Sequence, residues 1–167
     1  MILVYKNGLL NYKNKIYRCS LGKNGVTNNK IEGDGRTPLG SFNLGPLYYR
    51  SDRIKKINTL LKTIPTEKDM YWSDYPESIY YNKLINFKDK SFESLFINEN
   101  IYDIILVIKY NSNPIIPYKG SAIFLHLAKK NYSKTKGCIA LKKDCLLEIL
   151  ELLSPNEKIK ILPSNYN

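Results

Sequence analysis

The first fifty residues alternate between apolar and polar positions over short segments. Predicted strands cover residues 2–5, 9–12, 16–21 and 41–44. Asn7-Gly8 separates the first two, and Asn-Gly between two apolar alternations is a strong signal for a β-hairpin. Lys13-Asn14 supplies the next turn, and a glycine-rich turn over 33–40 leads to the fourth strand. This part of the chain is therefore predicted to be a set of short strands joined by tight turns.

The pattern changes over residues 51–100. Apolar residues recur at helical spacing at Ile54, Ile57, Leu60, Leu61 and Ile64. Such spacing predicts a helix, which Pro65 would end because proline lacks the N–H that continues a helix. A polar stretch rich in aromatic residues follows. We therefore expect residues 51–100 to form a partly helical insertion that folds over the sheet.

The last third of the chain returns to strands, with one helix among them. Residues 101–110 are almost continuously apolar and β-branched, which predicts a central strand buried on both faces. Residues 121–127 are its expected neighbour. Helical periodicity extends over 143–153, and Asp144 suits the positive N-terminal end of a helix. Residues 157–162 form the last predicted strand, so the chain is predicted to be mainly β with one packed helix.

Composition supports a single domain over residues 1–167. With 167 residues and 43% hydrophobic content, the chain can bury a substantial core. Three cysteines cannot all pair, and we expect Cys19 and Cys145 to be buried residues without a chemical role. One histidine and no Cys-x-x-Cys step argue against a zinc site. We expect no metal and no cofactor, and we expect a monomer.

The formal net charge of +11 favours contact with polyanions such as nucleic acid, anionic lipid or a cell-wall polymer. The basic residues are scattered, without the dense block typical of a nucleic-acid-binding tail. We therefore expect no nucleic-acid partner, whose binding would show as steeply salt-dependent retention on DNA. Residues 1–6 are too short an apolar stretch for a secretory signal, and no segment approaches the length of a membrane span.

The candidate chemistry lies in the predicted strand 121–127 and the loop after it. His126, the only histidine, ends the apolar run, and Cys138 follows Gly137 twelve residues later. A thiol is a weak nucleophile until it ionises, and an imidazole can take its proton. The amides of residues 136–138 could converge on an oxyanion, because Gly137 permits unusual backbone dihedrals. The pattern predicts a cysteine nucleophile with a histidine base, suited to acyl transfer.

Either residue alone has a simpler interpretation. A lone histidine in an apolar segment is usually a core residue, and free cysteines are among the most buried side chains. Their occurrence together, with Gly137 directly before the thiol, favours chemistry over packing.

Two segments resemble the YkuD-type L,D-transpeptidase catalytic domain. Gly33-Asp-Gly-Arg-Thr-Pro-Leu-Gly-Ser-Phe42 fits the family's G-x-x-x-T-P-x-G-x-F, and the His126 strand followed by Thr135-Lys-Gly-Cys-Ile139 fits its histidine and S/T-x-G-C-[IV] motif. The resemblance implies a YkuD-like β-sandwich with a helix after the catalytic cysteine. It implies catalytic roles for Cys138, His126 and Gly137, with peptidoglycan tetrapeptide stems as substrates. It also implies a periplasmic or cell-envelope location.

The chain departs from the family pattern near the cysteine motif. Leu127 stands where many members have Gly or Ser, and Ala140 stands where many have Arg. We therefore expect a main-chain carbonyl, such as that of Leu127, to hold the second ring nitrogen of the imidazole. Arg36, Arg53 or Lys136 could take over the role of the missing guanidinium.

A second candidate cluster lies in the predicted insertion. Residues 71–82 contain the only tryptophan, Trp72, together with Asp74, Tyr81 and Asn82. Aromatic rings can stack on a sugar or peptide, and Asp74 could pair with a substrate ammonium such as that of a diaminopimelate stem. Ordinary packing of the insertion explains the cluster equally well. The expected substrate-binding residues are Arg36, Trp72, Asp74, Tyr81, Asn82, Thr135 and Lys136.

We therefore interpret the chain as a cysteine acyltransferase, an L,D-transpeptidase that forms a thioester on Cys138. Three alternatives stay open. One is an L,D-carboxypeptidase on the same scaffold, in which water replaces the acceptor amine. Another is a non-catalytic, basic cell-wall-binding module, in which an unactivated Cys138 would be alkylated only as the pH nears about 8.5. The third is a nucleic-acid binder, which would not need Cys138.

Overall fold

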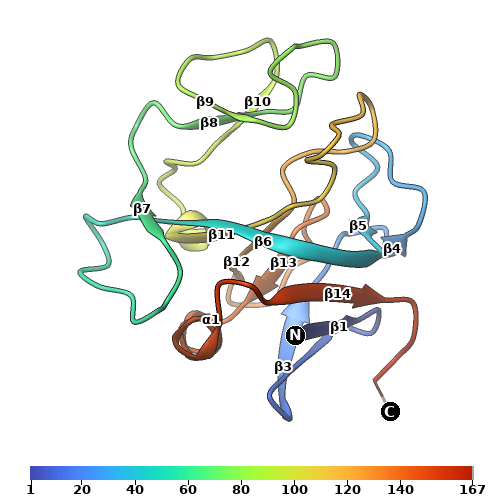
Figure 1. Cartoon of the computed structure of the whole chain (residues 1–167), viewed down its shortest axis with the longest axis vertical. Coiled ribbons are helices and arrows are strands. Elements are labelled where there is room, and N and C mark those ends of the chain that lie inside the picture. The colour runs from blue at the N-terminus through green and yellow to red at the C-terminus, as the bar shows by residue number, and fades with distance from the viewer. Residues whose placement is uncertain (167) are drawn as a thin grey trace.

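A mixed sheet of nine strands forms the body of the protein in the computed structural model, which describes residues 1–166 (Figure 1). The strands are β1 (Ile2–Tyr5), β2 (Leu9–Tyr12), β3 (Lys15–Ser20), β6 (Gly40–Tyr49), β7 (Thr63–Pro65), β11 (Ile104–Ile108), β12 (Phe124–Leu127), β13 (Ile139–Leu141) and β14 (Lys158–Leu162). Their order is β11-β12-β13-β3-β2-β1-β14-β6-β7. Strand β6 also pairs with β11, which closes the sheet on itself.

Strands β3 and β6 divide the closed sheet into two layers. The first part of β6 pairs with β14 and the second part with β11. In the same way, β3 pairs first with β2 and then, at Cys19 and Ser20, with β13. The main core contains buried residues from both layers, among them Ile2, Val4, Leu10, Leu47, Leu106, Leu125, Ile139 and Ile159. The predicted mainly β architecture, with two layers of strands around one core, is confirmed.

The predicted strands of the last third are also present. All five residues of β11 are buried, and the strand lies between β6 and β12, as expected of a central strand. Its predicted beginning differs, because Asn100–Tyr102 form a short 3-10 helix, η1. The final strand β14 pairs in parallel with β1.

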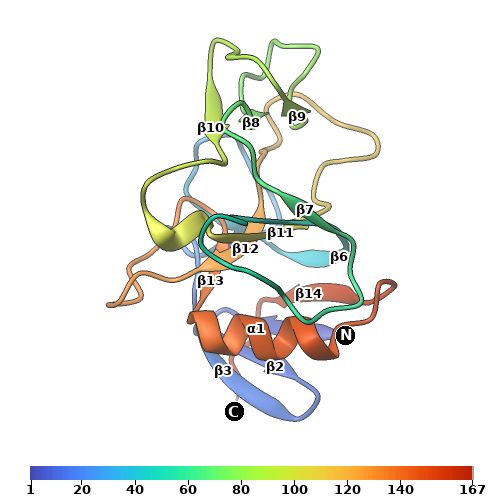
Figure 2. The same cartoon turned by 90° about the vertical axis from the view of Figure 1, so that its left-hand side faces the viewer.

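The helix after Cys138 forms as predicted. Helix α1 (Lys143–Leu152, Figure 2) carries Asp144 in its first turn and buries Leu146, Ile149 and Leu150. These positions recur every three or four residues, so they lie on one face of the helix and join the main core. Within residues 1–166, no helix has the length and apolar character needed to cross a bilayer.

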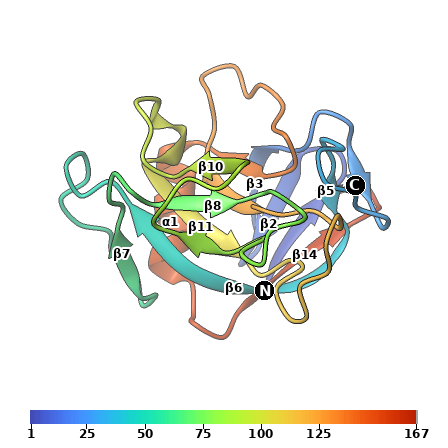
Figure 3. The same ribbon diagram turned by 90° about the horizontal axis from the view of Figure 1, so that it is seen from above.

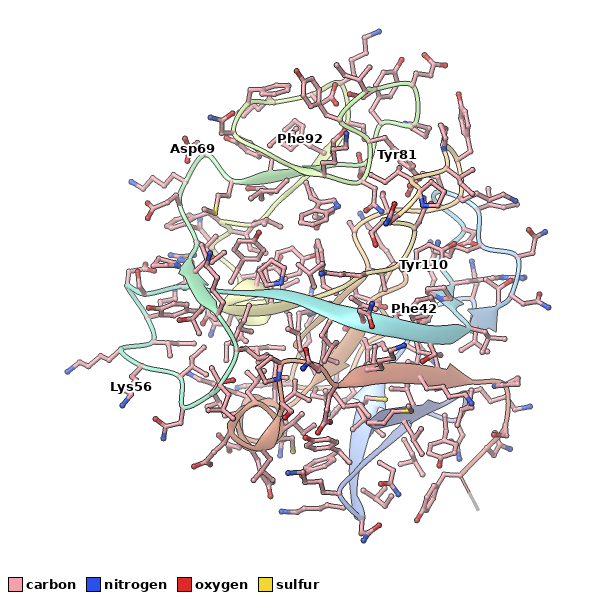
Figure 4. The ribbon with its side chains drawn as sticks, viewed as in Figure 1. Phe42, Lys56, Asp69, Tyr81, Phe92 and Tyr110 are labelled. Carbon is pink, nitrogen blue, oxygen red and sulfur yellow. The ribbon has the colours of Figure 1, made fainter. Side chains whose placement is uncertain are left out.

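The helix predicted over 54–64 does not form. Residues in this segment are irregular until β7, which pairs in parallel with β6. Ile54 and Ile57 are buried in the main core, whereas Leu60 is 73% exposed and the side chain of Lys56 points outward (Figure 4). The apolar spacing therefore reflects two anchoring side chains and not a helical face.

Ion pairs fix the residues just before this irregular segment, at positions 50–53. Arg50 donates to both carboxylate oxygens of Asp52, at 2.8 and 2.7 Å, and to the carbonyl of Ile97 at 2.6 Å. Arg53 forms an ion pair with Asp103 at 2.7 Å. The segment is thereby tied to residues that flank η1.

A small sheet covers one face of the main sheet. It consists of β8 (Tyr71–Ser73), β9 (Leu84–Ile85) and β10 (Phe92–Ser94), in the order β10-β8-β9. It lies above β11 and β12 in Figure 1, and the view from above shows β8 crossing over β11 (Figure 3). Trp72 of β8 packs edge-to-face on Phe124 of β12, with ring centroids 5.2 Å apart. Residues of the predicted insertion therefore do fold over the sheet, as strands instead of a helix.

A third, two-stranded sheet carries the Thr-Pro element of the sequence. It consists of β4 (Val26–Thr27) and β5 (Thr37–Pro38), which pair in parallel. Phe42, which follows this element in β6, packs edge-to-face against Tyr110 with ring centroids 5.5 Å apart (Figure 4). This packing fixes the glycine-rich turn beside the loop that leads into β12.

Candidate active site

Two parallel strands bring His126 and Cys138 to the same face of the main sheet. Strand β12 pairs with β13 in the register Leu125 to Ile139 and His126 to Ala140. Side chains alternate between the faces of a strand, and Leu125 and Ile139 belong to the main core. His126 and Ala140 therefore face the other way, together with Cys138. Ordinary strand spacings separate the Cα atoms of His126 and Cys138 by about 8 Å.

Both side chains line one cavity of about 670 Å³. Asp74, Thr135, Lys136 and Gly137 also line it. The loop from β12 to β13 therefore returns the cysteine to the strand that carries the histidine, so six of the ten predicted site residues meet at one cavity.

The thiol of Cys138 is hydrogen-bonded to the backbone of the segment before His126. The N–H of Phe124 donates to Sγ at 3.4 Å, and the thiol donates to the carbonyl oxygen of Ala122 at 3.2 Å. The side chain is only 8% exposed, and burial raises the pKa of the thiol to about 12, against the opposing effect of the Phe124 N–H. The resting thiol is therefore protonated at neutral pH.

The imidazole of His126 is oriented by its own backbone. Nδ1 lies 3.0 Å from the carbonyl oxygen of Leu127. A carbonyl only accepts hydrogen bonds, so Nδ1 carries the proton and Nε2 is the basic nitrogen. The predicted main-chain carbonyl at position 127 is therefore confirmed. Burial lowers the pKa of His126 to about 4, while the backbone carbonyls of Leu127 and Ile101 favour the protonated ring. The ring is neutral at pH 7 and can accept a proton.

The turn before Cys138 is built around Thr135. Its hydroxyl donates to the carbonyl of Cys138 at 2.6 Å and accepts the N–H of Gly137 at 3.1 Å. Gly137 has φ +148°, and a Cβ there would lie 2.8 Å from the carbonyl oxygen of Arg36, so the position requires glycine. The predicted three-amide cradle needs correction, because Thr135 already holds the Gly137 amide. The amides of Lys136 and Cys138 have no hydrogen-bond acceptor within the described chain.

Charged residues of both signs surround the cavity. Lys30 is buried, 5% exposed, and forms an ion pair with Asp34. Glu32 accepts hydrogen bonds from the hydroxyls of Tyr81 and Ser121, the latter at 2.7 Å. Lys30, Glu32 and Ser121 all line the cavity, so an anchored cation and an anchored anion face it together.

Three further carboxylates line the same cavity, those of Asp74, Glu93 and Glu99. Glu93 of β10 accepts the hydroxyl of Tyr102 at 2.9 Å. Tyr102 in turn packs edge-on against His126, with ring centroids 5.2 Å apart. Oδ1 of Asp74 is buried and, among residues 1–166, has no hydrogen-bond partner. Asp74 therefore presents a buried carboxylate oxygen without an internal partner at the cavity wall.

Four of the predicted substrate-binding residues do not line the cavity. These are Arg36, Trp72, Tyr81 and Asn82. The side chain of Arg36 is exposed, and Trp72 donates from Nε1 to Oδ1 of Asn82 at 2.9 Å. Tyr81, labelled to the right of the small sheet in Figure 4, is 2% exposed, and its hydroxyl donates a hydrogen bond to Glu32. The polar side-chain atoms of Trp72, Tyr81 and Asn82 are hydrogen-bonded inside the protein, so they are not available to a ligand in the cavity.

Several cavity residues were missed by reasoning from the sequence, among them Tyr102, Glu93 and Glu32. They lie outside any recognisable motif, and the contact of Glu32 with Tyr81 joins segments far apart in the chain. Glu32 had one available signal, since it directly precedes the glycine-rich turn at Gly33.

All three cysteines are free. Cys19 is buried as expected, whereas Cys145 is only half-buried. Within the described residues, no three His, Cys, Asp or Glu side chains gather as a group that could hold a metal ion.

The chain matches one protein-family model over most of its length. The model of the L,D-transpeptidase catalytic domain, YkuD, matches residues 1–161, so the chain belongs to this family. No curated protein matches the sequence.

Two solved structures are similar to this chain. The helical cell shape determining protein Pgp2 from Campylobacter jejuni is 14% identical with a TM-score of 0.48, over 99% of this chain and 48% of that chain. An L,D-transpeptidase from Mycobacterium smegmatis is 12% identical with a TM-score of 0.44, over 96% of this chain and 57% of that one. The chain thus spans about half the length of these two structures.

Proposed function

We propose that this chain is an L,D-transpeptidase that transfers peptidoglycan stem peptides through a thioester on Cys138. The observation that carries the proposal is the register of β12 and β13, which puts a thiol and a neutral imidazole on one face and at one cavity. Membership of the L,D-transpeptidase catalytic domain family supports the same chemistry.

In the first half-reaction, Sγ of Cys138 attacks the carbonyl between the third residue of a tetrapeptide stem and its terminal D-alanine. Because thiol and imidazole both rest neutral, the proton leaves Sγ for Nε2 of His126 as the bond to carbon forms. The carbonyls of Leu127 and Ile101 favour the imidazolium that results. The free amides of Lys136 and Cys138 are the available donors to the oxyanion.

The tetrahedral intermediate collapses to the thioester, and its C–N bond breaks. His126 returns the proton to the departing nitrogen, and D-alanine leaves. An amine of a second stem then attacks the thioester, which forms a new amide and regenerates the thiol, with His126 again carrying the proton. Water in place of the amine gives a free carboxylate, the L,D-carboxypeptidase reaction.

The charges at the cavity suit a stem peptide, which bears both carboxylates and an ammonium. Asp74 offers a carboxylate oxygen without an internal partner, which fits a substrate ammonium. Lys136 and Lys134 are exposed lysines at the cavity edge that suit a carboxylate. Such a substrate is found in the cell envelope, so we propose that the protein works there.

The proposal is tested with a purified disaccharide-tetrapeptide, with products separated by chromatography and identified by mass. Wild type should release D-alanine and form a 3,3-linked dimer, and Cys138→Ala should do neither. Cys19→Ala is the matched control because its thiol is buried away from the cavity.

The product pattern decides among the functions. A tripeptide without dimer would assign the carboxypeptidase reaction. Absence of both products, with retention on isolated cell walls, would assign the basic binding module. Turnover by Cys138→Ala at the wild-type rate would refute the thiol mechanism.

A further inference from the structure

Both polar atoms of the Asn82 side-chain amide are hydrogen-bonded inside the protein. Oδ1 accepts the indole N–H of Trp72 at 2.9 Å and the backbone N–H of Ala122 at 3.1 Å. Nδ2 donates to the carbonyls of Tyr110 at 3.1 Å and Asn111 at 2.7 Å. The residue is 7% exposed and has φ +56°, a backbone conformation that asparagine tolerates better than most residues. Asn82 therefore joins the small sheet to the segment that enters β12.

Ala122 links this bridge to the thiol. Its N–H is held by Asn82, and its carbonyl oxygen accepts the hydrogen bond from Cys138. Ala122 itself has φ +51°, which costs free energy for a residue with a Cβ and must be held by the surrounding contacts. Two hydrogen bonds thus connect the side-chain amide of Asn82 with the sulfur, both made by the backbone of the single residue Ala122.

We propose that Asn82 is a positioning residue for Cys138: it holds the Ala122 carbonyl against the thiol, so that the small sheet sets the orientation and protonation of the nucleophile. The proposal rests on the assignment of Cys138 as nucleophile. It moves Asn82 from the substrate-binding role expected from the sequence to a role behind the nucleophile, out of reach of the substrate.

Loss of the bridge has a defined consequence for the thiol. A hydrogen bond donated by the neutral thiol disfavours ionisation, so a relaxed Ala122 lets Cys138 ionise at lower pH. The value of one hydrogen bond corresponds to a shift of about one pH unit. The ionisable groups that face Cys138 are Glu93, Lys30, Tyr102 and His126, and they keep their places in the variants below.

The experiment measures the alkylation rate of Cys138 by iodoacetamide between pH 5 and 10, with each cysteine followed separately by peptide mass spectrometry. Asn82→Gly is the test variant, because glycine adopts the positive φ freely and only the amide is lost. Asn14→Gly, at φ +63° in an exposed turn, is the matched control. Buried Cys19 serves as the internal reporter, since it stays unreactive while the fold is intact.

The Cys138 profile should move by about one unit to lower pH in Asn82→Gly, seen as roughly tenfold faster alkylation at each pH up to 10, and stay unchanged in Asn14→Gly. Trp72→Phe, which removes one bond to Asn82 and keeps the ring, should shift it by less in the same direction. With stem substrate, kcat of Asn82→Gly should fall at least about tenfold, which corresponds to the free energy of one hydrogen bond, while KM should stay within about twofold of wild type. The reason is that the thiol is no longer held in its orientation for attack, whereas the residues that line the cavity are unchanged.

Coincident profiles for wild type and Asn82→Gly, with Cys19 still protected, would overturn the proposal. If Cys19 becomes reactive in Asn82→Gly, the fold of that variant is disturbed and Trp72→Phe replaces it as the test. An unshifted Cys138 profile in Trp72→Phe would then overturn the proposal. A rise in KM with kcat unchanged would restore the direct substrate-binding role. The alkylation profile needs no stem substrate, so it tests the role of Asn82 independently of the proposed transpeptidation.

Discussion

The sole histidine gives a prediction about stability as well as chemistry. Burial lowers the pKa of His126 from 6.5 to about 4 in the folded protein. Between these two values, the unfolded chain binds a proton that the folded chain does not. The contribution of His126 to the free energy of unfolding is therefore fully present above pH 6.5 and is lost as the pH falls toward 4. At about 1.4 kcal/mol per pH unit, the loss is about 3 kcal/mol.

Urea unfolding at a series of pH values from 4 to 7.5 measures this loss, with His126→Asn as the matched variant. Asparagine keeps a side-chain N–H for the carbonyl of Leu127 and does not titrate in this range. Carboxylates also titrate there, but they are common to both proteins. The difference between the two free energies of unfolding should therefore shrink by about 3 kcal/mol between pH 6.5 and 4.

The imidazole signals in NMR spectra check the same pKa directly, since every histidine signal belongs to His126. Its midpoint should lie near pH 4 in the folded protein. A midpoint near 6.5, or a stability difference that stays constant over the pH series, would refute the idea of a buried, neutral imidazole at rest.

Three substitutions test the rest of the site. Gly137→Ala should abolish turnover and destabilise the fold, because its Cβ would lie 2.8 Å from the carbonyl oxygen of Arg36; an active, equally stable variant would show that the turn can move. Thr135→Val should cut kcat by about tenfold or more, because it removes the bonds to Gly137 and Cys138, and unchanged kcat would contradict this. Asp74→Asn should raise KM for a stem with a free ammonium but not for an N-acetylated stem, and equal effects on both would remove the assigned contact.

Local patterns sufficed for much of the fold. The Asn7-Gly8 hairpin, the buried strand β11 and the helix after Cys138 each depend on residues within one segment, and each formed as predicted. The prediction of a helix over 54–64 was wrong because periodicity cannot distinguish a helical face from two separate core side chains, Ile54 and Ile57, in an irregular segment.

In the candidate site, too, features within one segment could be predicted and contacts between distant segments could not. His126, Cys138 and the carbonyl of Leu127 could be predicted because they lie within one strand and the loop that follows it. The hydrogen bonds of Tyr81 to Glu32, and of Asn82 to Ala122, join segments that come together only in the folded protein. Sequence reasoning placed Asn82 among the substrate-binding candidates but could not tell that its amide is fully hydrogen-bonded inside the protein.

Acylation of Cys138 is the most direct measure of the proposed function. Intact-mass spectrometry after brief incubation with a disaccharide-tetrapeptide should detect a wild-type adduct equal to the stem minus D-alanine. Peptide mapping should locate it on Cys138, and hydroxylamine should release it as expected of a thioester. No adduct on wild type under conditions of turnover, or the same adduct on Cys138→Ala, would contradict the account.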